Sequence, residues 1–331
     1  MKRVALLVLL LAGCGNESTG ETGEPDAGVV APDAADPIAE RQAAATATAT
    51  MNAKCTALGD FYWEIGDGTQ MLGHGAIGTT YAQDTEMSIA SASKIVFGAY
   101  VVELAEGNLT ANQKSALRML SGFHGLNPVK CSAAATVADC LNAGAPGPNY
   151  TYDAADVGHF HYDGAHDQMF AVDVLGIGAL SAPQLTTLVM NKLGISPGFV
   201  LASPLPSGGI RASAAQFAIF LRAIVHGDLR LRDQLGAEPV CTLPGTSCPS
   251  AASSPSPLAW HYSYNHWVED DAAGDGAFSS PGAFGFYPWI SADKTLYGIL
   301  ARQSTAGGGG FSSFECGQAI RRAWITATVQ L

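Results

Sequence analysis

A serine and a lysine stand three residues apart at the start of an almost wholly apolar run. The segment SIASASKIVFGAYVVELAEG covers residues 88–107, with Ser91 and Lys94 near its beginning. Its composition predicts a buried helix that ends at Gly107. Residues three apart on a helix lie on the same face, so the Ser91 hydroxyl and the Lys94 ammonium can touch.

Such a pair is suited to nucleophilic catalysis. A lysine in apolar surroundings is costly to keep charged, so it can take a proton from a neighbouring hydroxyl. Ser91, in the first turn, would also lie at the positive end of the helix dipole, which favours negative charge on its oxygen during attack. The spacing alone is weak, because most lysines of this kind reach water along an apolar surface.

The elements that must position this pair are strands at both ends of the domain and helices between them. Residues 60–78 predict a hairpin that turns at Gly66, and residues 282–304 predict two strands joined by a turn at 291–294. Residues 109–235 are mainly helical in pattern. We therefore predict an α/β (α+β) fold, an antiparallel sheet flanked by helices, with an inserted all-helical lobe over about residues 109–235.

The N-terminal residues predict export. Lys2 and Arg3 precede the apolar run 4–12, which is too short to span a bilayer, and small residues lead to Cys14. This arrangement resembles the lipobox of bacterial lipoproteins. Residues 1–13 are then a lipoprotein signal peptide and Cys14 the site of lipid attachment, which makes the membrane a partner; an ordinary secretory signal is the alternative.

The segment after Cys14 predicts a tether that links a cell-envelope protein to its membrane anchor. Residues 15–50 hold seven acidic residues, one arginine and no aromatic residue, so residues 14–50 are expected to form a disordered acidic tether before a domain at 51–331. Gly15 after Cys14 favours the outer membrane over the inner one. The net charge of −12 argues against a nucleic-acid partner.

Six further cysteines in an exported chain indicate disulfides. Cys131 with Cys140, and Cys241 with Cys248, are close enough in sequence to close local loops, which leaves Cys55 for Cys316. That last bond would place both ends of the domain side by side. The sequence alone does not fix this connectivity, and free buried thiols are the alternative.

Five segments, in order, resemble the motifs of one protein family. They are IASASK (89–94), LRMLSGFHGL (117–126), FHYDGAHDQ (160–168), SGGIRASAAQFAIFL (207–221) and SSPGAFGFYPWIS (279–291). Together they are similar to the serine β-lactamase and penicillin-binding protein superfamily, and more closely to its class C-like branch of esterases and D,D-peptidases. The resemblance covers about residues 60–326.

This resemblance implies a role for each matching residue. Ser91 would be the nucleophile that forms an acyl-enzyme, Lys94 its base, and Tyr162, in the second motif, a group that shares or relays the proton. The backbone N–H groups of Ser91 and Ala283 would form the oxyanion hole. Water would then hydrolyse the acyl-enzyme, with no metal or cofactor.

Two departures from the family pattern bear on the substrate. Gly164 stands where the second motif usually has Asn, and Ser280, in the third motif Ser280-Pro281-Gly282, stands where Lys or His is usual. The lost cation would hold a carboxylate. These changes favour an esterase or amidase acting on a small acyl substrate. A β-lactamase or D,D-carboxypeptidase is the alternative, with Arg211 or Arg302 as the cation.

A non-catalytic lipoprotein that binds cell-wall peptides is a further alternative. The losses at Gly164 and Ser280 are what such a protein would show. Against it, Ser91, Lys94 and Tyr162 are all present.

Other constellations are weaker. His159, His161 and Asp163 approach the zinc run His-x-His-x-Asp-His, but Gly164 follows, so we predict no metal and expect His161 and His166 to line a polar cleft beside Tyr162. No Gly-x-Ser-x-Gly pentapeptide, the nucleophile motif of ordinary Ser-His-Asp hydrolases, occurs in the sequence.

A set of aromatic residues is large enough to form the wall of an acyl pocket, although a role in the core is as common. These residues are Trp260, Tyr262, Tyr264, Trp267 and Phe286.

Overall fold

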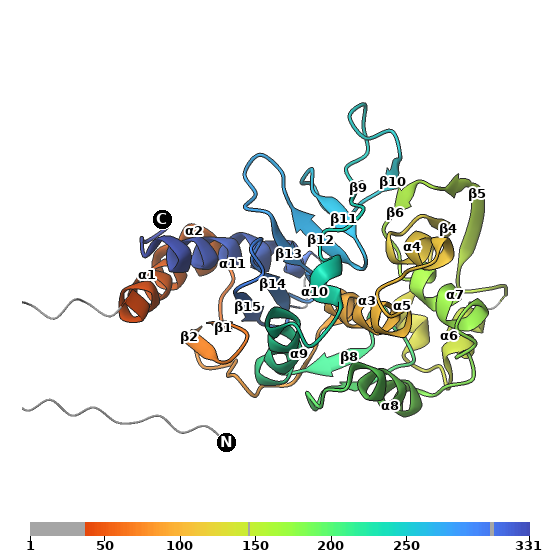
Figure 1. The fold of residues 1–331 in the computed structure, drawn as a ribbon, viewed down its shortest axis with the longest axis horizontal. Helices are drawn as coiled ribbons and strands as arrows, with labels where there is room; N and C mark the ends of the chain where they lie inside the picture. Colours follow the sequence, from red (N-terminus) through yellow and green to blue (C-terminus); the bar gives the residue numbers. More distant parts are fainter. Residues whose placement is uncertain (1–36, 145, 305–307) are drawn as a thin grey trace, which may run out of the picture. The chain divides into compact units, whose positions relative to one another are not determined.

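The computed structural model describes residues 37–144, 146–304 and 308–331 (Figure 1). The expected signal peptide at 1–13, the lipid-attachment residue Cys14 and the tether up to residue 36 lie outside the described residues. None of the described helices is both long enough and apolar enough to cross a membrane.

The centre of the domain is an eight-stranded sheet in which every neighbouring pair is antiparallel. In spatial order its strands are β2 (Met71–Ile77), β1 (Phe61–Gly66), β15 (Tyr297–Ala301), β14 (Tyr287–Ile290), β13 (Ala277–Ser279), β12 (His266–Glu269), β11 (His261–Ser263) and β9 (Val240–Cys241). Because β1 pairs with β15, strands from the two ends of the domain lie side by side in one sheet. The predicted antiparallel sheet built from both ends is confirmed.

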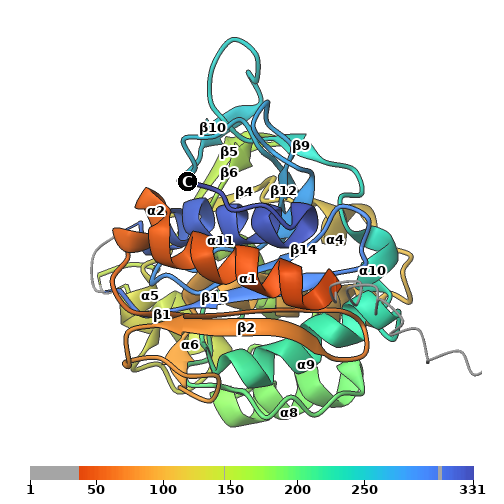
Figure 2. The ribbon, with the colours of Figure 1, turned by 90° about the vertical axis from the view of Figure 1, so that its left-hand side faces the viewer.

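Side chains alternate along the strands between two apolar layers. On β15, Tyr297 and Ile299 belong to one buried cluster and Leu300 to the other, as the two-residue period of a strand requires. One layer holds α9 (Ala214–His226), and the other holds α11 (Gly309–Thr326). In Figure 2 these two helices lie on opposite sides of β15. The sheet is therefore covered by helices on both faces.

The expectation of a disordered tether is wrong for residues 37–50. Pro37–Met51 form helix α1, which packs on α11 and β2 and buries Ala44, Ala45 and Ala49 (Figure 2). Alanine is the best helix former, and its small side chain lets two helices approach closely. The apolar surface that orders this segment comes from α11, almost three hundred residues later, and composition alone did not reveal it.

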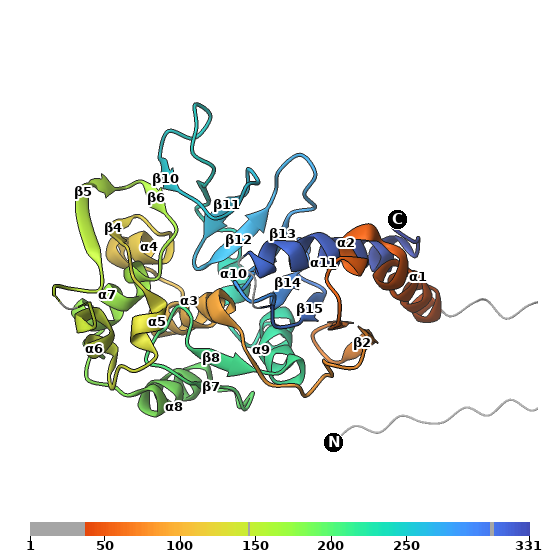
Figure 3. The same cartoon turned by 180° about the vertical axis from the view of Figure 1, so that it is seen from behind.

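The inserted lobe is not all-helical. Over residues 109–235 it contains helices α4 to α10. Besides α9, whose bounds are given above, these are α4 Ala111–Leu117, α5 Pro128–Cys131, α6 Val137–Asn142, α7 Ala165–Asp173, α8 Ala182–Leu193 and α10 Leu231–Gln234. Five short strands interrupt them: β4 Ser121–His124, β5 Thr151–Val157, β6 Phe160–His161, β7 Val200–Leu201 and β8 Ile210–Ala212. Figure 3 shows β4, β5 and β6 among these helices. Four of the strands are too short to display a two-residue period in the sequence.

Two of the lobe's strands pair with strands from outside it. β8 pairs with β3 (Met87–Ser88), just before the segment of Ser91, and β6 pairs with β10 (Ala251–Ser253). The lobe is thus tied to the rest of the domain on both sides of the predicted site.

The predicted central helix is present as a 3₁₀ turn, η1 (Ala90–Ala92), followed by α3 (Ser93–Leu104). Every residue from Ser93 to Glu103 is buried. The chain leaves the helix through two residues of positive φ, Glu106 and Gly107, and the Gly107 N–H donates to the Val102 carbonyl. The helix is therefore a core element with its first turn facing the site.

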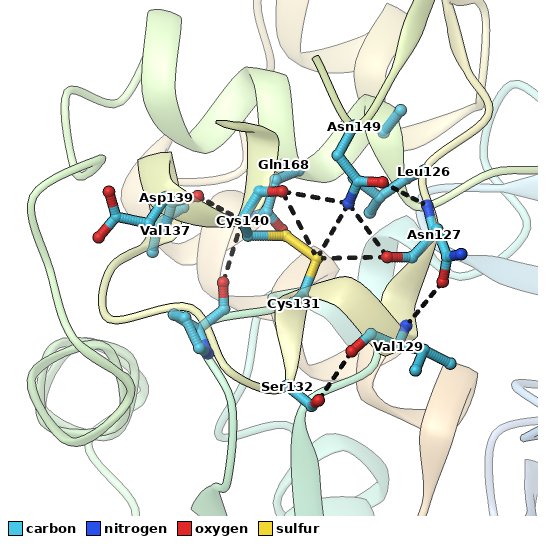
Figure 4. The surroundings of a disulfide bond; sticks show 12 residues. Leu126, Asn127, Val129, Cys131, Ser132, Val137, Asp139, Cys140, Asn149 and Gln168 are labelled. Carbon is cyan, nitrogen blue, oxygen red and sulfur yellow. Dashed lines mark hydrogen bonds between the residues drawn. A yellow bond between two sulfur atoms is a disulfide. The ribbon is translucent and has the colours of Figure 1, made fainter. Parts of the chain in front are cut away.

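The three disulfides have the predicted pairing: Cys55–Cys316, Cys131–Cys140 and Cys241–Cys248. The first joins α2 (Ala53–Thr56) to α11. Figure 4 shows the second, where the Asn149 amide donates to the carbonyls of Asn127 and Cys140 at 3.0 and 3.1 Å. The first two bonds join helices that also pack against each other, α2 with α11 and α5 with α6.

Candidate active site

Lys94 and Ser91 are in direct contact at the start of the central helix. Lys94 Nζ donates to Ser91 Oγ at 3.2 Å and to the Ser207 carbonyl, also at 3.2 Å. The Lys94 side chain is 4 % exposed, whereas Ser91 is half-buried. The predicted contact is thus present, with the lysine beneath the serine and the serine facing outward.

The turn that carries Ser91 is strained and braced. Ala90 has φ of +47°, a region that residues with a side chain rarely adopt. The Ile89 N–H donates to the Ile210 carbonyl, and Ser280 Oγ donates to the Ser91 carbonyl at 3.0 Å. Contacts from two distant segments therefore hold the turn.

The third motif lies directly behind this turn. Ser280-Pro281-Gly282 follows the end of β13, and a Cβ at Gly282 would lie 2.0 Å from the Ile89 carbonyl oxygen, so only glycine fits. Ser280 is 3 % exposed, and its hydroxyl is directed at the backbone of Ser91. Ser280 and Gly282 thus support the turn and do not border the cavity described next.

Ser91 opens into a cavity of about 300 Å³. Its lining residues are Ser91, Tyr162, Pro255, Trp267, Pro281, Ala283, Gly308, Gly310 and Phe311. None of these side chains carries a charge. Of the predicted aromatic set, Trp267 borders the cavity, and the other four are buried outside its lining; Phe311 was not predicted.

Ala283 lies on the same cavity as Ser91, which is the placement that an oxyanion hole built from their N–H groups requires. Neither Arg211 nor Arg302 borders it. Arg211 is exposed on β8, and Arg302 donates to Ser313 Oγ at 2.9 Å and to the Leu58 carbonyl. Neither arginine replaces the missing cation in this geometry.

Tyr162 presents its ring, not its hydroxyl, to Lys94. Lys94 Nζ lies 4.9 Å from the ring centroid, a cation–π contact, and the ring stacks on Trp267 at 5.2 Å. The Tyr162 N–H donates to the Ser253 carbonyl, but the hydroxyl makes no hydrogen bond within the described part of the chain. A proton relay through Tyr162 therefore requires the hydroxyl to move toward Ser91 or Lys94.

The space beside Gly164 is filled by Ser207. A Cβ at Gly164 would lie 2.5 Å from Ser207 Oγ and 3.1 Å from Leu126 Cδ2. The same Ser207 supplies the carbonyl that binds Lys94. Sequence reasoning did not single out this residue, although it begins the Ser-Gly-Gly segment that matched the family.

Asp167 is a second unpredicted neighbour of Lys94. It is fully buried, and burial raises its pKa to about 7, while the Lys94 charge and a hydrogen bond from Asn265 act in the opposite direction. Asn265 Nδ2 donates to Asp167 Oδ1 at 2.9 Å. Asp167 Oδ2 and the Tyr262 hydroxyl have no hydrogen-bond partner among the described residues.

Neither His161 nor His166 borders the cavity of Ser91, and His166 lines a separate hollow with Ser121 and Phe123. His166 Nε2 donates to the His161 carbonyl at 2.8 Å, so Nδ1 accepts from the Ser121 hydroxyl at 2.6 Å. Burial lowers the pKa of His166 to about 4, which keeps the ring neutral. The expectation that these two histidines line a cleft beside Tyr162 is therefore wrong.

Comparison with known proteins gives a likeness in structure only. No protein-family model and no curated protein matches the sequence. A β-lactamase from Mycobacterium bovis is 13% identical with a TM-score of 0.56, over 82% of this chain and 96% of that one. A D-stereospecific amidohydrolase from Streptomyces sp. is 12% identical with a TM-score of 0.56, over 84% and 97%.

A third structure, EstCE1, a hydrolase with promiscuous acyltransferase activity, is 13% identical with a TM-score of 0.57, over 87% of this chain and 98% of that one. At these identities the likeness concerns the fold. The chain has the fold of the β-lactamase-like and penicillin-binding-protein-like serine hydrolases.

Proposed function

We propose that this protein is a serine hydrolase that forms an acyl-enzyme on Ser91. The observation that carries the proposal is the contact between a buried lysine and a half-buried serine at the wall of an open cavity. A surface lysine would not be held at 4 % exposure with a serine hydroxyl as one of its two hydrogen-bond partners.

The proposed reaction uses Lys94 as general base and general acid. Neutral Lys94 takes the proton of Ser91 as Oγ attacks the substrate carbonyl, and the N–H groups of Ser91 and Ala283 stabilise the oxyanion. The bond to the leaving group breaks and Lys94 returns the proton to it. Water then attacks the acyl-serine, with the same proton transfers, and Ser91 is regenerated.

The charge of Lys94 acts on Asp167. The ammonium favours the ionised form of this carboxyl, whereas burial raises the pKa of Asp167 to about 7. Asp167 is in this proposal a positioning residue, because it does not border the cavity.

The cavity favours small uncharged esters or amides. Its walls include the apolar side chains of Trp267, Phe311 and Pro281, and its lining holds no cation to bind a carboxylate. For this reason we place the esterase or amidase ahead of the β-lactamase and the D,D-carboxypeptidase. A non-catalytic binding protein does not require a buried lysine in hydrogen-bond contact with a serine hydroxyl.

The test is the intact mass of the protein after exposure to p-nitrophenyl acetate, a fluorophosphonate and a penicillin. We expect a single adduct that is absent in Ser91→Ala and retained in Ser132→Ala, a change of an exposed serine next to Cys131 that does not border the cavity. Faster labelling by the acetate than by the penicillin supports the esterase. If none of the reagents forms an adduct, the acyl-enzyme proposal fails and the non-catalytic binding protein is the remaining candidate.

We also propose that the protein is an exported lipoprotein anchored through Cys14, on the strength of the sequence of residues 1–14. Mass spectrometry of the mature N-terminal peptide tests this proposal. A diacylated Cys14 supports it, and a processed chain whose Cys14 is unmodified contradicts it.

A further inference from the structure

A cluster of two histidines and one aspartate lies outside the candidate active site. The ring nitrogens of His124 and His161 and a carboxylate oxygen of Asp156 all lie within 4.8 Å of one another. Asp156 Oδ2 is 3.5 Å from His124 Nε2 and 3.4 Å from His161 Nδ1. Each of the three side chains is about one fifth to one quarter exposed.

These separations match the spacing of ligands around zinc. Zn–N and Zn–O bonds of about 2.0–2.1 Å at a tetrahedral angle place two ligand atoms about 3.3 Å apart. The carboxylate is already at that separation from both nitrogens. The partial exposure of the cluster lets water complete the fourth position.

The backbone brings these ligands together before any ion binds. His124 ends β4, Asp156 is the sixth residue of β5, and β4 and β5 pair antiparallel. His161 ends β6, and its N–H donates to the carbonyl of Met119, two residues before β4. The N–H groups of Gly125 and Leu126 donate to the Asp163 carboxylate, which joins the two chain segments just after His124 and His161.

The two imidazoles need one adjustment. Their rings are stacked, with centroids 4.3 Å apart and planes 5° from parallel. An ion lies in the plane of each ring that binds it, so at least one ring must turn about χ2 to bring both nitrogens to the ion. This torsion has a broad energy minimum for histidine, and the exposed edge of the cluster gives the ring room.

We propose that His124, Asp156 and His161 form a site for Zn²⁺ that clamps the β4–β5 pair to β6. Imidazole nitrogen and carboxylate oxygen are ligands that zinc takes in proteins. Two other described pairs, His226 with Asp228 and His261 with Asp270, have the same histidine–aspartate contact without a second histidine. The second imidazole separates this cluster from a simple ion pair.

The location gives the ion a structural consequence. His161 is followed by Tyr162, whose ring covers Lys94 and lines the cavity. A bound ion would fix β6 and hence the position of that ring. The ion is not a reactant in the hydrolysis proposed above. The zinc proposal therefore does not depend on the proposed hydrolase activity.

The test is isothermal titration calorimetry. The purified protein is first freed of metals with EDTA and is then titrated with ZnCl₂. We expect one Zn²⁺ per chain. His124→Gln and His161→Gln should each lower the affinity by roughly tenfold or more, because even groups that only orient a ligand account for 10–100-fold. His226→Gln is the matched control and should bind zinc as the unmodified protein does.

A second variant and a second measurement cover the case in which a histidine variant misfolds. Asp156→Asn keeps the shape of the side chain and should also lower zinc affinity, while its melting temperature without metal stays near that of the unmodified protein. The Co²⁺-loaded protein should show the visible absorption of a tetrahedral site. Absence of stoichiometric binding, or binding unaffected by Asp156→Asn, overturns the proposal.

Discussion

Ser207 occupies the space that a side chain at position 164 would fill, with its Oγ 2.5 Å from where a Gly164 Cβ would lie. The backbone carbonyl of the same serine binds Lys94. Where the motif that this segment resembles usually has Asn, this chain has Gly164, packed against Ser207 from another segment. Lys94 has the Ser207 carbonyl as an oxygen partner without an Asn at position 164.

Gly164→Ala should test the packing of Ser207 beside position 164. The added methyl group meets Ser207 Oγ, and overpacking of this kind costs about 1 kcal/mol or more. In a Ser207→Ala background the nearest remaining Ser207 atom is at 3.5 Å, so the cost should fall. A double-mutant cycle from urea unfolding measures the coupling. Equal costs in both backgrounds would show that the two side chains do not compete for space.

Lys94→Met should lower both stability and reactivity. The variant keeps the volume of the buried chain but removes the ammonium that acts on Asp167 and donates to the Ser207 carbonyl, so we expect the free energy of unfolding to fall by about 1–3 kcal/mol. Without a base, the rate of Ser91 acylation by p-nitrophenyl acetate should fall by about 10²–10⁴-fold. Stopped-flow acylation and urea unfolding on the same sample check both parts, and an unchanged acylation rate contradicts the role of Lys94.

Asp167 should make stability depend on pH. Burial raises its folded-state pKa to about 7 from an unfolded value of 3.8, so the folded protein binds a proton that the unfolded chain has lost. Its contribution is complete below pH 3.8 and is lost as pH rises toward 7, by a few kcal/mol in total. Unfolding free energies at pH 5 and pH 8 should differ less in Asp167→Asn. An identical pH dependence in that variant would show that Asp167 ionises normally in the fold.

Gly282→Ala should damage the nucleophile turn. Its Cβ would lie 2.0 Å from the Ile89 carbonyl oxygen, a backbone atom that cannot turn away, so Ala90 and Ser91 must shift. A displacement of about 1 Å at a reacting group can cost 10²-fold in rate. We expect acylation to fall by that order. Ala272→Gly, at an exposed position after β12 that does not border the cavity, is the control and should retain the acylation rate.

Loss of the Cys55–Cys316 bond should cost more than loss of Cys131–Cys140. The first closes a separation of 261 residues and the second a separation of 9. In the chain-entropy model the difference between the two loops is about 3 kcal/mol. Melting curves of Cys55→Ala/Cys316→Ala and Cys131→Ala/Cys140→Ala measure it, and a larger loss from the shorter loop would contradict that model for this protein.

The parts of the site that follow from local spacing were predictable. Ser91 and Lys94 are neighbours because a helical turn makes them so, and the order of the five motifs predicted that Tyr162 and Ala283 would border the same cavity as Ser91. Ser207, Asp167 and Asn265 were not predicted. They reach Lys94, or each other, only through packing between segments that lie far apart in sequence.

The fold shows the same division. β1, β2, β14 and β15 were predicted because these strands are rich in alternating bulky residues. The other strands of the sheet, α1 and the short strands of the lobe were not predicted. An alanine-rich segment has the same composition whether it is free or packed on a partner, and two-residue strands carry no period. In both cases the missing information is the identity of a distant partner.

Because β1 pairs with β15, the central sheet cannot form completely until nearly the whole chain is present. The first hairpin lacks its neighbour, and α1 lacks α11, until residues after 297 have been made. A nascent chain of this topology stays incomplete throughout synthesis, because its non-local contacts form last. In the export that we propose from residues 1–14, such a delay would leave the polypeptide unfolded during translocation, the state in which it can be threaded across a membrane.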